Sequence, residues 1–222
     1  DTGENAQEYH NKVGEWYRIP YVSIKDTVYQ KMKNGEFTRQ ELTEDGLHPN
    51  AMGHKLVAGE IIAFLEKVKK QMWEEEAEQM LPPQLTANAY EYARCLTIRD
   101  ICPQLLGFRA DTEEKMGHLD FFKNGWIGKK KGDRIVFKVE ASCIAVQYRK
   151  TLKQPAARAK LILDGDSEQT FLLDGNFDET WGECLWLERI LHHGVRKEHT
   201  IEIEMQEGEG LTPFYMMSLI VA

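Results

Sequence analysis

The hydrophobic pattern of this 222-residue chain changes its period near residue 80. Before that point apolar residues recur at helical spacing, most clearly over residues 57–72. Beyond it the pattern alternates with a period of two, as in residues 201–205. An acidic run and then Pro82-Pro83 mark the linker between the two patterns. The change therefore predicts two domains, residues 1–80 and residues 88–222, in a chain of α/β plus all-β class.

The first domain is predicted to alternate helix and strand. Helical spacing predicts helices over residues 5–16 and 27–34, and a long helix that Asn50 can cap. The apolar run at residues 19–24 contains β-branched residues, which favours a buried strand of a parallel sheet. This order is typical of an α/β domain.

The second domain is predicted to be an antiparallel β-sandwich of jelly-roll type, because many short strands follow one another at regular spacing. The sequence Asp164-Gly165 between two of them is a hairpin signal. The candidate strands are Cys95–Ile98, Arg134–Val139, Cys143–Tyr148, Ala159–Leu163, Gln169–Leu173, Cys184–Ile190, Thr200–Met205 and Phe214–Val221.

Charge and composition exclude some classes of partner. The net charge is −8 and no basic face is visible, so nucleic acid is not expected as a partner. No apolar run approaches the roughly 20 residues that span a bilayer, so no membrane partner is expected. The four cysteines show no C-x-x-C spacing, and no signal peptide is visible. Both features favour a reducing, cytoplasmic compartment.

The loop around His48 is the strongest chemical signal in the sequence. Asp45 precedes His48 by three residues, and Pro49 follows it directly. An imidazole can act as a general base, and a carboxylate beside it can orient the ring and stabilise its charged form. The alternative is that Asp45 caps a turn and His48 is a surface histidine. The predicted strand upstream of the loop and the helical stripe directly after it favour the catalytic interpretation.

This loop, Asp45-Gly46-Leu47-His48-Pro49, resembles the last sequence block, Asp-x-x-His-Pro, of the SGNH (GDSL-type) serine hydrolases. The following Asn50-x-x-Gly53-His54 fits the usual continuation of that block. The resemblance covers residues 1 to about 70 and implies the C-terminal portion of a flavodoxin-like α/β/α domain. It also implies that His48 is the general base and that Asp45 orients it.

The same resemblance requires a Gly-Asp-Ser nucleophile block and a Gly and an Asn for the oxyanion hole, and nothing before Asp45 supplies them. Ser23 is the only serine in that region, and it lies in the predicted strand. We therefore expect the chain alone to be inactive. A missing N-terminal SGNH segment, on a longer product or on a partner chain, would carry the nucleophile.

Three later motifs imitate functional sites. Gly165-Asp166-Ser167 lies between two apolar runs, which predicts a hairpin tip and not a nucleophile, and Gly175-Asn176 imitates the oxyanion-hole pair equally poorly. His192-His193 with His199 could indicate a metal, but adjacent residues of a strand point to opposite faces. No metal site and no organic cofactor are predicted.

The strand pattern of residues 144–148, 160–165, 198–203 and 214–220 resembles that of the β-sandwich modules attached to bacterial carbohydrate esterases, over about residues 125–222. Trp181, in a polar loop, and Trp126 are the candidate residues for stacking on a sugar ring. The alternative is that the indole of Trp181 plugs the end of the sandwich, and the same alternative applies to Trp126.

Together these features predict a serine esterase of SGNH type that removes acetyl or another small acyl group from a carbohydrate. The predicted substrate is an acylated carbohydrate or a small ester. The alternative is a non-catalytic carbohydrate-binding or interaction module.

Overall fold

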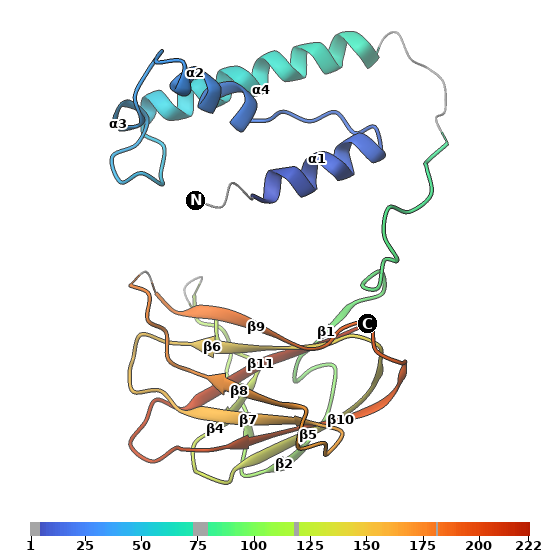
Figure 1. The fold of residues 1–222 in the computed structure, drawn as a ribbon. Coiled ribbons are helices and arrows are strands. Elements are labelled where there is room, and N and C mark those ends of the chain that lie inside the picture. The colour runs from blue at the N-terminus through green and yellow to red at the C-terminus, as the bar shows by residue number, and fades with distance from the viewer. Residues whose placement is uncertain (1–4, 73–79, 118–119, 181) are drawn as a thin grey trace. The chain divides into compact units, whose positions relative to one another are not determined.

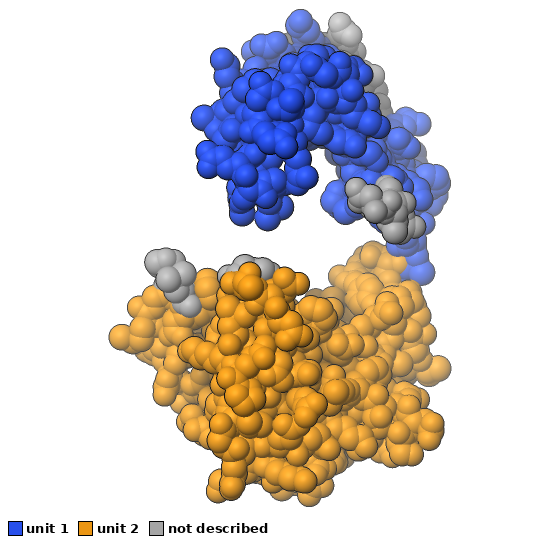
Figure 2. All heavy atoms as spheres, turned by 60° about the vertical axis from the view of Figure 1, so that its left-hand side comes forward, with its two compact units in different colours: residues 1–87 blue, residues 88–222 orange. Residues whose placement is uncertain are grey.

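The computed structural model describes residues 5–72, 80–117, 120–180 and 182–222. The chain divides into two compact units, residues 1–87 and residues 88–222, and each is described by itself (Figure 2). None of the described helices combines the length and the apolar content that a bilayer-spanning helix needs.

Unit 1 is helical in its described residues. Its elements are α1 (Ala6–Trp16), a π-helical turn (Lys25–Tyr29), α2 (Gln30–Lys33), α3 (Arg39–Leu42) and α4 (Ala51–Met72) (Figure 1). The side chain of Asn5 caps α1 by accepting a hydrogen bond from the Gln7 N–H. Asn50 caps α4, as predicted, because its Oδ1 accepts from the N–H groups of Met52 and Gly53 at 3.0 Å.

The predicted strand at residues 19–24 is wrong. Residues 19–23 carry no strand, and neither 5–72 nor 80–87 contains one that could pair with them. The Ile19 residue is 54% exposed and Tyr21 is 44% exposed. An apolar run becomes a strand only where a neighbouring strand accepts its backbone hydrogen bonds.

Unit 2 is a sandwich of two antiparallel sheets (Figure 1). One sheet has the order β3-β4-β11-β6-β9, with β1 also paired to β11, and the other has the order β2-β5-β10-β7-β8. All eight predicted strands are present, and three further strands of two or three residues occur between the first two. The strands are β1 (Arg94–Leu96), β2 (Gln104–Leu106), β3 (Arg109–Ala110), β4 (Trp126–Gly128), β5 (Arg134–Ala141), β6 (Ile144–Lys150), β7 (Arg158–Leu163), β8 (Thr170–Asp174), β9 (Cys184–Leu191), β10 (Lys197–Met205) and β11 (Phe214–Val221).

The core of unit 2 lies between the two sheets, and alternate side chains of β5, β6, β7 and β10 point into it. Ile201, Ile203 and Met205 of β10 are fully buried, and the residues between them face outward. Trp126 of β4 meets Phe137 of β5 edge to face across the core, with ring centroids 5.2 Å apart. The predicted antiparallel β-sandwich is confirmed.

The Gly165-Asp166-Ser167 motif lies in the turn between β7 and β8. Asp164 and Gly165 adopt positive φ angles of 54° and 71°, and the Asp166 N–H donates to the Leu163 carbonyl at 3.0 Å. The interpretation of this motif as a hairpin tip is confirmed. In the next loop Asn176 binds the backbone N–H and C=O of Ala156, which is a structural role.

Candidate active site

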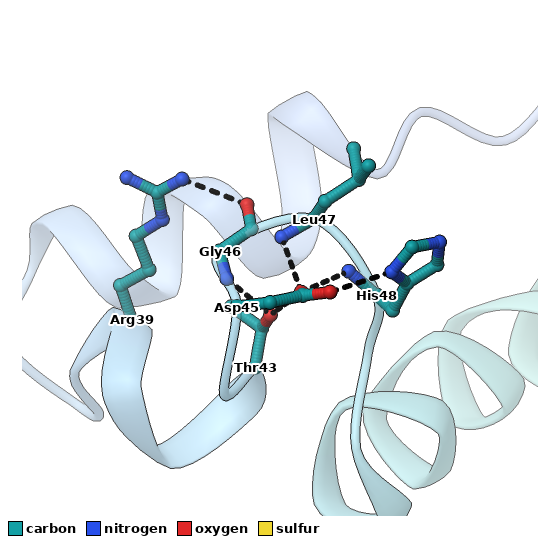
Figure 3. A network of polar contacts seen from close by, with 6 residues as sticks. All are labelled: Arg39, Thr43, Asp45, Gly46, Leu47 and His48. Atoms are coloured by element: carbon teal, nitrogen blue, oxygen red, sulfur yellow. Dashed lines mark hydrogen bonds and ion pairs between the residues drawn. The ribbon is translucent and has the colours of Figure 1, made fainter. Parts of the chain in front are cut away.

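Asp45 and His48 lie in the loop of residues 43–49, which joins α3 to α4 (Figure 3). A β-bridge between Thr43 and Pro49 closes the base of this loop. The Nδ1 atom of His48 is 2.6 Å from Oδ2 of Asp45. The sequence spacing therefore brings the predicted base and its predicted orienting acid into direct contact.

The Asp45 carboxylate is held by hydrogen bonds. The contact with the His48 ring lowers the pKa of Asp45 most, and the N–H groups of His48 and Leu47, at 2.8 and 2.9 Å from Oδ1, lower it further. The carboxylate is therefore ionised and can only accept hydrogen bonds. The proton of the contact must then belong to Nδ1 of His48, and in the neutral imidazole Nε2 carries the lone pair.

The pair is open to solvent within unit 1. The side chain of His48 is 79% exposed and that of Asp45 is 55% exposed. Nε2 of His48 has no hydrogen bond to any residue in the described part of the chain. An unbonded and exposed Nε2 is the state that a general base needs to receive a proton from a nucleophile.

The serines of this chain are engaged elsewhere, and none is hydrogen-bonded to His48 within the described residues. The Ser23 hydroxyl accepts from Gln7 Nε2 at 2.7 Å and from the Asp26 N–H at 3.0 Å. In unit 2, Ser142 and Ser218 donate to the Ala222 carbonyl and to Gln147, and Ser167 lies at the hairpin tip.

The structure corrects one of the two predicted sugar contacts. Trp126 is 1% exposed and packs against Phe137, so its indole has no free face for a sugar ring. It is a core residue, because β4 turns its side chain toward the opposite sheet. Trp181 lies outside the described residues, and its role stays a prediction.

A polar pocket of about 440 Å³ lies in unit 2, on the side of β4, β6 and β11 that faces away from the core. At its base the buried Asp111 accepts a hydrogen bond of 2.8 Å from the Tyr215 hydroxyl. The guanidinium of Arg149 lies 5.8 Å from the Phe122 ring centroid and 5.5 Å from that of Tyr215. Sequence reasoning missed this pocket, because its residues come from distant segments.

Arg149 is incompletely satisfied in this pocket. Its Nη2 donates to the Pro213 carbonyl at 3.1 Å, whereas its buried Nε has no hydrogen-bond partner among the described residues. A buried donor without an acceptor is costly. The mixture of charged groups and aromatic rings suits a ligand with many hydroxyls.

The described residues contain no group of three or more His, Cys, Asp or Glu side chains that could hold a metal ion. His199 is buried, with Nδ1 at 2.9 Å from Asp164 Oδ2. It therefore joins β10 to the β7–β8 hairpin.

Comparison with known proteins supports an esterase relationship. No protein-family model matches the chain, and no curated protein matches it either. Two crystal structures of a two-domain esterase active on acetylated mannans do match, one of them co-crystallized with mannopentaose. Both are 43% identical to this chain and cover 99% of it, with TM-scores of 0.87 and 0.89. This chain is similar to a carbohydrate esterase.

The similarity runs along nearly the whole chain, but the chain spans only 59–60% of the length of that esterase. The predicted relationship to carbohydrate esterases is confirmed.

Proposed function

We propose that this chain supplies the general base, His48, and its orienting acid, Asp45, to a serine esterase of SGNH type. The observation that carries the proposal is the 2.6 Å contact between Nδ1 of His48 and Oδ2 of Asp45, which leaves Nε2 unbonded and exposed. The loop that holds this contact is the segment that resembles the family's Asp-x-x-His-Pro block.

The chemistry follows from the protonation state of the pair. Nε2 of His48 would take the proton of a serine hydroxyl as that oxygen attacks the ester carbonyl. Asp45 would stabilise the resulting imidazolium through the Nδ1–H hydrogen bond. The imidazolium would then return the proton to the leaving hydroxyl of the substrate.

Ester hydrolysis by this pair would need a serine and an oxyanion hole from a segment that these 222 residues do not contain. Two observations support such a segment. About two fifths of the matched esterase has no counterpart in this chain, since the chain spans 59–60% of it. Apolar side chains of α4, among them Ile61, Ile62 and Leu65, are also exposed in unit 1, as a surface awaiting a partner would be.

For the substrate we propose an acetylated carbohydrate of the mannan type. The matched esterase is active on acetylated mannans, and that statement concerns the relative. In this chain the pocket beside Tyr215 and Arg149 supports a carbohydrate ligand, because it combines aromatic rings with charged hydrogen-bonding groups.

The experiment compares the 222-residue protein alone with the same protein supplied with a nucleophile-bearing segment. The 222-residue protein alone should give no adduct with a fluorophosphonate probe and no acetate release from acetylated mannan. With a nucleophile-bearing segment supplied on the same or a second chain, one probe should attach and acetate should be released. Labelling should be lost in His48→Ala and kept in His54→Ala, a matched change six residues along the chain. Robust His48-dependent hydrolysis by the verified 222-residue chain alone would overturn the requirement for a second segment.

The second candidate function is carbohydrate binding without catalysis, and the pocket in unit 2 favours it. Under this hypothesis the chain binds mannopentaose whether or not a nucleophile is present. Titration calorimetry on the full chain should show Arg149→Met weakening binding at least about tenfold, because a charge-assisted hydrogen bond is lost. Arg196→Met is the control, since Arg196 pairs with Glu140 at an exposed position elsewhere.

A further inference from the structure

The hydrogen bonds around Asp45 extend beyond the pair itself, to Thr43 and Arg39 (Figure 3). The Thr43 hydroxyl oxygen accepts a hydrogen bond of 2.9 Å from the Gly46 N–H, and it lies 3.2 Å from Asp45 Oδ1. The ionised carboxylate has no proton to give, so the Thr43 hydroxyl must be the donor to Asp45. The Gly46 N–H therefore donates to the Thr43 hydroxyl, and that hydroxyl donates to Asp45.

These hydrogen bonds give the two carboxylate oxygens of Asp45 different partners. Oδ1 of Asp45 faces three donors, which are the Thr43 hydroxyl and the N–H groups of Leu47 and His48. Oδ2 is left for Nδ1 of His48. Three contacts on one oxygen fix the rotation of the carboxylate and aim the other oxygen at the ring.

Arg39 holds the opposite side of the same turn. Its Nη2 donates to the Gly46 carbonyl at 2.7 Å, while Thr43 binds the Gly46 N–H. Gly46 has a φ of +81°, and a Cβ placed there would lie 2.5 Å from Arg39 Nη2. Hydrogen bonds therefore hold both polar backbone groups of Gly46, and its positive φ favours glycine at this position.

Polar contacts are needed here because packing is weak. With its side chain 79% exposed, the His48 ring is not held in place by burial within unit 1. A neutral imidazole in water can carry its proton on either nitrogen, and the partner of one nitrogen decides the tautomer. The orientation of Asp45 thus decides whether Nε2 keeps its lone pair.

We propose that Thr43 and Arg39 are positioning residues, which hold Asp45 so that His48 carries its proton on Nδ1 and keeps Nε2 free. The functional meaning of this inference rests on the proposed hydrolase function. The structural part concerns the tautomer of His48 and can be measured without substrate.

The experiment is long-range ¹H–¹⁵N NMR on the full chain labelled at histidine, at a pH at which the imidazole is neutral. Wild-type His48 should be mostly Nδ1–H. Thr43→Val should lose that majority, and Thr43→Ser, which keeps the hydroxyl, should restore it. Arg39→Met should shift the tautomer in the same direction as Thr43→Val, and Asp45→Asn marks complete loss of the carboxylate. His199 in unit 2, whose Nδ1 contacts Asp164, is an internal control that should not change.

A wild-type tautomer in Thr43→Val, or equal behaviour of the Val and Ser variants, would overturn the proposal. Loss of the backbone amide signals of α4 in unit 1 would mean that the variant had disturbed the fold around the loop; Thr43→Ser and Arg39→Met then decide the matter in its place. The esterase assay is separate. Absence of turnover in the completed enzyme defeats the proposed function and leaves the tautomer result standing, whereas His48-dependent turnover unaffected by Thr43→Val defeats the positioning role.

Discussion

The two units of this chain differ in how they bury apolar side chains. In residues 88–222 two sheets enclose a continuous core, and Phe137, Leu161 and Ile203 are fully buried. Among the described side chains of residues 1–87, Val28 is the only buried large hydrophobic one. The unit that holds the candidate catalytic pair is therefore not the unit that holds the core.

The stability of the protein and the geometry of its candidate catalytic pair therefore have separate physical origins. Burial between paired sheets supplies stability, at roughly 25 cal/mol for each Å² of apolar surface removed from water. The Asp45–His48 contact needs no such burial, because hydrogen bonds within residues 43–48 create it. Substitutions should accordingly affect chemistry in one unit and stability in the other.

The largest expected effect is on catalysis by the pair in unit 1. In the completed enzyme, His48→Ala should lower kcat/KM by about 10⁴-fold or more, because the nucleophile loses its base. Urea unfolding of the sandwich should stay unchanged. Acetate release and tryptophan fluorescence measure the two quantities on one preparation. If His48→Ala lowered both acetate release and the stability of the sandwich, catalysis and stability would not be separate in the two units.

Two matched leucine substitutions, one in each unit, test where the stability of the protein comes from. Leu161→Ala, at a fully buried position, should lower the free energy of unfolding by about 2–5 kcal/mol. Leu65→Ala, at a position that is 56% exposed on α4, should change it by less than about 0.5 kcal/mol. Urea titration gives both values. Similar losses in the two variants would show that unit 1 has a core of its own.

A smaller effect is expected at the helix that follows the catalytic loop. Asn50→Ala should destabilise α4 locally by about 1 kcal/mol, because Met52 and Gly53 lose the acceptor of their N–H groups. Amide hydrogen exchange at those residues measures it. Asn50→Asp keeps the acceptor and loses only the donation to the Glu41 carbonyl, so its exchange should stay close to wild type.

The smallest effect concerns pH and the sandwich. Burial alone would raise the pKa of Asp164, but hydrogen bonds from Thr200, Lys197 and His199 outweigh it and lower the pKa. A lowered pKa means stability that is present above the unfolded value, about 3.9, and lost as pH falls through the folded value.

Asp164→Asn should therefore reduce the acid sensitivity of unfolding below pH of about 4, by under about 1 kcal/mol because the carboxylate is partly exposed. Asp166→Asn, in the same hairpin, is the control. Equal pH dependence of unfolding in wild type and Asp164→Asn would show that Asp164 does not contribute to acid sensitivity.

Much of the fold could be predicted because the signals are local. The hydrophobic pattern predicted the seven strands of unit 2 that have five or more residues, and the candidate strand Cys95–Ile98 located the short β1. It missed β2, β3 and β4, which have two or three residues each. These strands exist because longer neighbours pair with them, as β11 pairs with β4.

The errors arose where an outcome depends on distant partners. Residues 19–24 look like a buried strand, yet the described part of unit 1 offers them no strand to pair with. Trp126 looked like a sugar contact, but its place in β4 opposite Phe137 made it a core residue. Neither result is visible in the residues that flank each segment.

The sequence by itself determined the change from helical to strand periodicity, the cap at Asn50 and the contact between Asp45 and His48. Each of these depends on residues a few positions apart, so little chain entropy opposes it. Only the tertiary structure decided the burial of Trp126 and the pocket in which Tyr215 meets Asp111, 104 residues away in sequence. Such contacts follow from strand order and register, which place β11 between β4 and β6 and which the alternation of a single strand does not encode.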